Sequence, residues 1–327
     1  MVCSYCEGSN RITGEHLIPQ GLLDLFAECE YNVHMMNADN EEDKLKVFKG
    51  DRVVINDVCD RCNNNDLSTL DSYGISLINE HFLRDYTKDD EVSVELDYDL
   101  FSRWILKLVY NNTRAFKQEY SDWFRNKKKY ILSNEKDEEM KFSIFSGLAV
   151  NTSPIPDFFM DNLKLLILFD PLLVKGSLLV PTDGGISPNF KVNTQTERLP
   201  IENIEFTALL RFGSLLIYTI FWKDDADVSY INNIEKIISQ LYPYTIVNSN
   251  DNLLNAVRAT HAYNFHHPYI VDSNVGMSFA DRTNSYLPSN ISPVKVQKSL
   301  EGDWPQIILQ MREQKRLKRK RKKRKKK

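Results

Sequence analysis

Four of the five cysteines in this 327-residue chain form two Cys-x-x-Cys pairs, Cys3 with Cys6 and Cys59 with Cys62. Two such pairs can surround one zinc ion tetrahedrally, and a closed site of this kind is structural. The N-terminus lacks the charged and apolar segments of a signal peptide, so we expect a cytoplasmic protein whose thiols stay reduced and bind metal. The fifth cysteine, Cys29, is expected to be a small buried side chain.

A second group of polar residues lies between and just after these pairs. Glu15 and His16 begin the sequence Glu-His-Leu-Ile-Pro, and Asn63 follows the last cysteine directly, with Asn64 and Asn65 behind it. An acidic residue with a histidine between two Cys-x-x-Cys pairs, and an asparagine after the last cysteine, together resemble the HNH endonuclease family. The resemblance covers residues 3–75 and does not extend into the rest of the chain.

The resemblance implies a metal-dependent endonuclease built on a zinc-stapled ββα-metal module. In the family the histidine takes a proton from the attacking water, which assigns the general base to His16. The acidic residue before it and a residue of the following helix hold a divalent ion, which assigns this role to Glu15 and Asn63. Oxygen ligands of this kind favour Mg or Mn over zinc. The implied substrate is nucleic acid, DNA in preference to RNA, and such modules also serve as effectors in antiviral defence or toxin systems.

Two features depart from the family pattern. The family's middle asparagine falls on the second strand, at the position of Val54 in this chain, and the nearest asparagine is Asn56. Asn64 and Asn65 also leave open which asparagine is the one from the helix. A second hypothesis therefore stands beside the first: a zinc-stapled nucleic-acid-binding or scaffold module that does not cleave.

Charge is distributed unevenly along the chain. Residues 312–327 contain 13 Lys or Arg and one Glu, whereas residues 1–311 contain 29 basic and 44 acidic residues. A block of like charges repels itself, and a basic block attracts polyanions. We therefore expect a disordered tail over residues 312–327 that binds nucleic acid; the alternative is an incidental run that only aids solubility.

The rest of the chain predicts an α+β fold. Apolar residues recur at helical spacing over residues 67–86, 98–130 and 228–241. Short apolar runs between turn-forming residues predict mainly antiparallel strands within residues 44–58, 142–150, 163–169, 177–180, 204–212 and 215–222. We divide the chain into an HNH-like module (1–86), a helical connector (87–139), an α+β domain that could bind a protein partner (140–311) and the basic tail (312–327).

The remaining histidines carry weaker signals. Single histidines are more often structural than functional, and we expect this of His34 and His81. His261, His266 and His267 cluster in the sequence, but no Cys or carboxylate lies beside them at ligand spacing, so we assign them no metal. No apolar run approaches the length of about 20 residues that a membrane-spanning helix needs, so no membrane association is expected.

Overall fold

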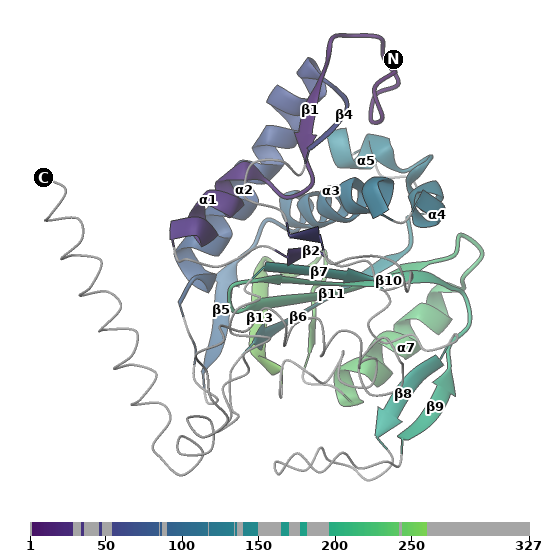
Figure 1. Cartoon of the computed structure of the whole chain (residues 1–327). Helices are drawn as coiled ribbons and strands as arrows, with labels where there is room; N and C mark the ends of the chain where they lie inside the picture. Colours follow the sequence, from purple (N-terminus) through teal and green to yellow (C-terminus); the bar gives the residue numbers. More distant parts are fainter. Residues whose placement is uncertain are drawn as a thin grey trace, which may run out of the picture.

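The structure is a computed structural model, and it describes residues 2–28, 34–35, 46–47, 54–84, 86, 90–116, 118–133, 135, 140–149, 165–169, 177–181, 196–241 and 244–259. Cys29, His261, His266, His267 and the basic tail lie outside the described residues. Within the described residues the chain is α+β, as the sequence predicts, with most helices in the N-terminal half and most strands in the C-terminal half (Figure 1).

The N-terminal part is a β-hairpin followed by a helix (Figure 1). Strand β1 (Ile12–His16) leads into helix α1 (Gln20–Glu28) and pairs antiparallel with β4 (Val54–Cys59). After β4 the chain continues through a π-helical turn η1 (Cys62–Leu67), helix α2 (Ser68–Leu77) and a second π-helical turn η2 (Ile78–Phe82). The paired strands β1 and β4, called the hairpin below, are separated in the sequence by α1 and a further stretch of chain, and α2 follows them.

A seven-stranded sheet forms the centre of the protein, in the order β5-β13-β6-β11-β10-β7 with β12 beside β6. The described pairs are antiparallel except β13 with β6, which is parallel. The strands are β5 (Glu91–Glu95), β6 (Phe142–Ala149), β7 (Leu165–Phe169), β10 (Ile204–Phe212), β11 (Leu215–Trp222), β12 (Thr245–Ile246) and β13 (Leu253–Ala259). Every residue of β11 is buried, so both faces of the sheet must be covered.

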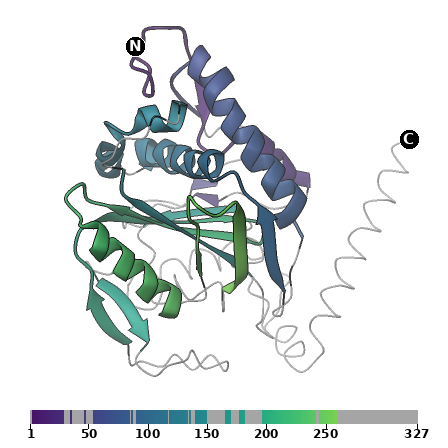
Figure 2. The same cartoon turned by 180° about the vertical axis from the view of Figure 1, so that it is seen from behind.

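Helices cover the two faces (Figures 1 and 2). On one face lies α3 (Tyr98–Phe116), followed by α4 (Gln118–Ser121), the 3-10 turn η3 (Asp122–Phe124) and α5 (Lys128–Ser133). The larger core fills the space between these helices, α2 and the sheet, and includes Trp104 and Phe212. On the other face α7 (Val228–Leu241) packs through Ile234 and Ile238 in a smaller core around Trp222.

Two small sheets are not part of the hydrogen-bonded central sheet. Strand β2 (His34–Met35) pairs with β3 (Lys46–Val47), and β8 (Ser177–Pro181) pairs with β9 (Thr196–Pro200). Across the described part of the chain, no helix is both long and apolar enough to cross a bilayer.

The structure contains elements that were not predicted, among them α1 and β13, and it changes two of the predicted segments. The helix expected over residues 98–130 is interrupted after α3, and within the following short elements the Trp123 indole nitrogen donates a hydrogen bond to the Trp222 carbonyl at 2.7 Å. The expected helical connector also contains strand β5, in which Val92 and Val94 are buried while their neighbours are exposed. That alternation is a strand signal, and pairing with β13 makes this segment part of the central sheet.

Candidate functional site

The four predicted zinc ligands converge at the base of the hairpin. The sulfurs of Cys3, Cys6, Cys59 and Cys62 all lie within 4.8 Å of one another, and those of Cys6 and Cys59 are 3.7 Å apart. Tetrahedral zinc with bonds of about 2.3 Å places its sulfurs about 3.8 Å apart, so a slight contraction of this cluster would complete the site. Elsewhere in the described chain, no group of three or more His, Cys, Asp or Glu ligand atoms comes together in this way.

The pKa values of these cysteines show how strongly the neighbouring sulfurs interact. Burial opposes ionisation of Cys3, yet backbone hydrogen bonds, led by the one that the Cys59 amide donates to its sulfur at 3.3 Å, lower the pKa of Cys3 to about 7. Burial and the neighbouring sulfurs raise the pKa of Cys62. Four thiolates this close repel one another unless a cation lies between them, and zinc supplies that charge. The donor set therefore fits structural zinc.

Helix α3 holds the loops that carry these cysteines. The Tyr5 hydroxyl donates a hydrogen bond to the Asn111 side-chain oxygen at 2.6 Å. Arg114 forms an ion pair with Asp57 next to the second cysteine pair, and its guanidinium lies 4.7 Å from the centre of the Tyr110 ring. These contacts connect the four-cysteine cluster directly to the helix that covers the central sheet.

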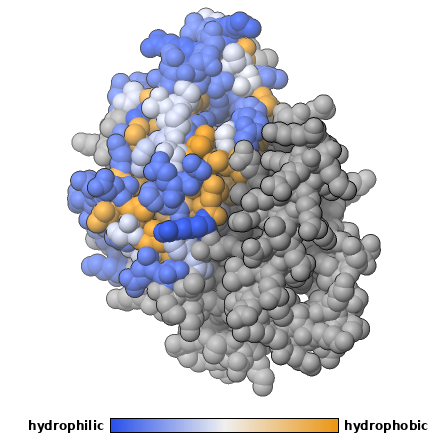
Figure 3. Space-filling model, turned by 90° about the vertical axis from the view of Figure 1, so that its left-hand side faces the viewer, coloured by the Kyte–Doolittle hydropathy of each residue, from blue (hydrophilic) through white to orange (hydrophobic). Residues whose placement is uncertain are grey.

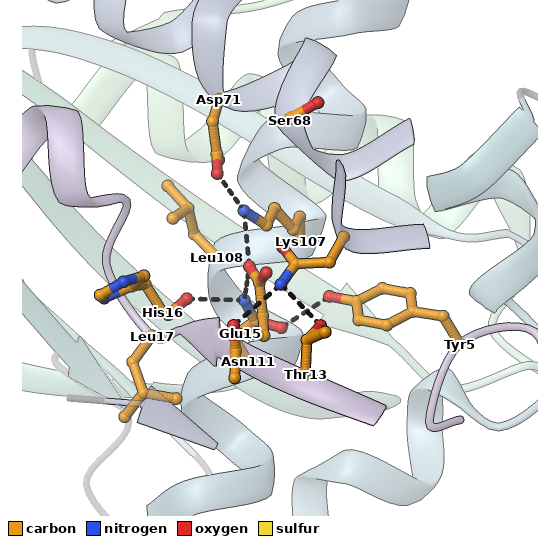
Figure 4. A network of polar contacts seen from close by, with 12 residues as sticks. Tyr5, Thr13, Glu15, His16, Leu17, Ser68, Asp71, Lys107, Leu108 and Asn111 are labelled. Atoms are coloured by element: carbon orange, nitrogen blue, oxygen red, sulfur yellow. Dashed lines mark hydrogen bonds and ion pairs between the residues drawn. The ribbon is translucent and has the colours of Figure 1, made fainter. Parts of the chain in front are cut away.

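Glu15 lies on the side of β1 that faces the helices, and one oxygen of its carboxylate already has two partners (Figure 4). The residue is only 3% exposed, and its Oε1 accepts hydrogen bonds from the Lys107 ammonium at 2.8 Å and from the Asn111 side-chain amide at 3.0 Å. The same ammonium lies 2.5 Å from Oδ2 of Asp71 on α2. Burial raises the pKa of Asp71 to about 6, although Lys107 acts in the opposite direction.

His16 ends β1, and Figure 4 shows its ring turned away from the Glu15 carboxylate. Its backbone carbonyl accepts a hydrogen bond from the Asn111 side chain at 3.1 Å, so one asparagine contacts both residues of the pair. The ring nitrogen Nδ1 is buried and has no hydrogen-bond partner among the described residues. The structure therefore does not bring the His16 ring and the Glu15 carboxylate together.

Asn56 lies on the same face of the hairpin as His16. The pairing register shifts between Thr13 and Glu15, which places two residues of β4 opposite Gly14. His16 pairs with Val54, and residues two apart on a strand share a face. A Cβ atom added to Gly14 would lie 3.0 Å from the side-chain oxygen of Asn56 and 2.4 Å from Val54 Cγ1, so only glycine fits there.

Asn63 connects the start of the helix to β1. Its side-chain nitrogen donates hydrogen bonds to the Gly14 carbonyl at 2.8 Å and to the Thr13 hydroxyl at 3.1 Å. These contacts place Asn63 on the Thr13 side of β1 and orient its amide nitrogen toward the strand. Its neighbours Asn64 and Asn65 are exposed at the surface.

Sequence reasoning missed Lys107, Asp71 and Asn111. A signal existed for Lys107, because it is the one charged residue in the otherwise apolar run Trp104–Tyr110. A charge inside a buried stripe must be paired, since an unpaired buried charge is strongly destabilising. The sequence could not show which carboxylates would pair with it.

Comparisons of this chain with models of known protein families, with curated proteins and with solved structures give no match. What the protein does must therefore be inferred from its own residues.

Proposed function

We propose that this protein is an endonuclease that hydrolyses phosphodiester bonds in nucleic acid, DNA in preference to RNA, with His16 as the general base. The observation that supports the proposal best is the four-cysteine cluster at the base of a β-hairpin that leads into a helix, with His16 at the end of the first strand. A purely structural zinc module has no need of a histidine whose buried Nδ1 lacks a described partner.

In this proposal the His16 ring accepts a proton from the water that attacks the phosphorus. A neutral imidazole can accept such a proton and act as a general base. Asn56, on the same face of the hairpin, supplies the polar side chain that the family carries on the second strand. The surface around the hairpin, at the top of Figure 3, is mostly hydrophilic, which suits a solvent-exposed face better than burial against a protein.

The Mg or Mn ion expected at Glu15 and Asn63 does not fit the described geometry. The Glu15 carboxylate is buried and paired with Lys107, and Asn63 turns its amide nitrogen, which is not a metal ligand, toward β1. No step of the proposed reaction is therefore assigned to a metal at these two residues. Zinc at the four cysteines holds the hairpin to the helix and takes no part in the chemistry.

The second candidate function is a zinc-stapled nucleic-acid-binding module that does not cleave. The contacts of Glu15 favour it, because a carboxylate used to hold α3 is not available to a catalytic ion.

Both candidates use the basic tail for binding. Deleting residues 312–327 should therefore flatten the salt dependence of DNA binding, by roughly 0.9 in log–log slope for each phosphate that the tail neutralises.

Plasmid cleavage distinguishes the two candidates. Zinc-loaded wild type, His16→Ala and the control His81→Ala would be assayed without added metal, with Mg and with Mn. His81 lies on η2 with its side chain 37% exposed, away from the hairpin. Loss of a general base should slow cleavage by about 10²–10⁴-fold in His16→Ala, with unchanged zinc content and unchanged cleavage by His81→Ala.

Two outcomes contradict the nuclease proposal. Cleavage by His16→Ala at the wild-type rate would remove the proposed base. A folded, zinc-loaded wild type that binds DNA but cuts under none of the three conditions would support the binding module instead.

A further inference from the structure

One ammonium group lies between the buried Glu15 carboxylate and the partly buried Asp71 carboxylate, beside the strand that carries the proposed base. The Lys107 side chain has no exposed surface, and its nitrogen contacts Glu15 at 2.8 Å and Asp71 at 2.5 Å. The three groups come from three elements, β1, α2 and α3, and Figure 4 shows the lysine between the two acids. Together they carry a net charge of −1 when all are ionised.

We propose that Lys107 is the built-in cation of this site: its ammonium occupies the position between Glu15 and Asp71 that a divalent ion would need in order to use both carboxylates, so the wild-type protein holds no Mg or Mn through Glu15. That Lys107 occupies the space between the two acids follows from its contacts alone. Only the statement that this space belongs to a nuclease site rests on the proposed function. In this inference Lys107 supplies the positive charge and Asp71 helps to hold it in place. Glu15 then only positions β1 against α3.

Geometry shows why one cation excludes the other. An Mg ion binds carboxylate oxygens at about 2.1 Å in a nearly octahedral shell that usually keeps several waters. The Lys107 nitrogen already lies at hydrogen-bond distance from one oxygen of each acid, and the lysine side chain is closed to solvent. A divalent ion there would meet a positive charge at very short range and would have no room for its waters.

The lysine cannot easily leave. It lies in the middle of α3, between Leu106 and Leu108, which are both buried in the larger core. Withdrawing the ammonium would leave the buried Glu15 carboxylate without a compensating charge, and an unpaired buried charge is strongly destabilising. Asn111, one turn further along α3, donates to Glu15 and to the His16 carbonyl, so the same helix also fixes the strand that carries the proposed base.

Manganese binding to the full-length, zinc-loaded protein tests the inference. Mn binding, followed by electron paramagnetic resonance and calorimetry, would be compared in wild type, Glu15→Gln, Lys107→Met and the double variant Glu15→Gln/Lys107→Met. Lys127→Met is the matched control, because Lys127 is also buried and paired with a carboxylate, Asp224, but on another part of the fold.

Wild type and Glu15→Gln should give the same Mn isotherm. Lys107→Met should gain a Mn site more than about tenfold tighter than any in wild type, because a cation repelling the ion at close range is gone. The double variant should lose that site, and Lys127→Met should not gain it. Lys107→Arg, which keeps a cation, should behave as wild type.

Two results would overturn the inference: a wild-type Mn site that Glu15→Gln removes, or a folded Lys107→Met protein that gains no site. If Lys107→Met fails to fold even with Mn present, the comparison of wild type with Glu15→Gln decides alone. Failure of the proposed function is distinguishable, because absence of cleavage in wild type leaves the Mn isotherms as expected. Conversely, if wild type cleaves only with Mg or Mn and Glu15→Gln abolishes this cleavage, the inference is wrong, but the proposal that the protein is a nuclease is supported.

Discussion

Replacing one zinc ligand should unfold the N-terminal part of the protein. Cys59 is completely buried at the end of β4, where its backbone amide also donates to the Cys3 sulfur. Structural zinc contributes on the order of 10 kcal/mol or more to folding in small peptides, which is comparable to the whole stability of an ordinary domain, about 5–15 kcal/mol. We therefore expect Cys59→Ser to lose its zinc, and the backbone amides of β1, β4 and η1 to lose their protection from hydrogen exchange.

The size of the effect should depend on the position of the ligand. Cys6 is exposed, so Cys6→Ser removes a zinc bond without placing a hydroxyl in the core. Cys59→Ser should be more destabilising than Cys6→Ser, by about 1–3 kcal/mol for the unsatisfied buried hydroxyl.

Zinc content by mass spectrometry and amide hydrogen exchange along the chain measure both effects. Cys29→Ser, which changes the fifth cysteine, is the control and should keep about one zinc per chain. A wild-type protein that is fully folded after zinc removal by a chelator, with β1 and β4 still protected from exchange, would refute the reasoning.

Two further predictions concern the packing beside this module. Gly74→Ala should lower the free energy of unfolding by about 1–3 kcal/mol, and with it the thermal midpoint, because the added Cβ would lie 2.1 Å from the buried Trp104 ring. Gly21→Ala is the control and should be nearly neutral, because its Cβ would meet only the flexible tip of the Ile75 side chain, at 2.6 Å. The pKa of Asp71 is raised from 3.8 to about 6, so the folded state retains a proton that the unfolded chain releases. Stability measured by urea unfolding should therefore fall as pH rises from about 4 to about 6, by on the order of 3 kcal/mol, and Asp71→Asn should flatten this slope.

Local patterns were sufficient to predict much of the fold. Strands β10 and β11 and helix α7 have the bounds that hydrophobic runs and helical spacing predict, because each pattern is complete within one segment. The four-cysteine cluster was predictable for a similar reason, since two Cys-x-x-Cys pairs leave few other ways to use reduced thiols. The short strand β5 was missed because its alternation spans only five residues next to a polar stretch.

The ion pair between the Glu15 carboxylate and Lys107 could not be predicted from the sequence. Lys107 is separated from Glu15 by the second cysteine pair, α2 and β5, and only the packing of α3 against the module brings the two together. Sequence alone shows that Lys107 interrupts an apolar run and therefore needs a partner. It does not show that the partner is the acidic residue that the HNH resemblance assigns to a metal.

The hairpin register changes how the departures from the family pattern should be weighed. Counted along the sequence, Val54 stands in place of the middle asparagine, but the shift opposite Gly14 leaves Asn56 on the His16 face, so this departure no longer argues against catalysis. The salt bridge of Glu15 does argue against it, and it lies on the opposite face of the same strand. Because neighbouring residues on a strand face opposite sides, His16→Ala leaves the Lys107 contacts in place and Glu15→Gln leaves the imidazole in place. Cleavage and manganese binding can therefore be assigned to the two faces separately.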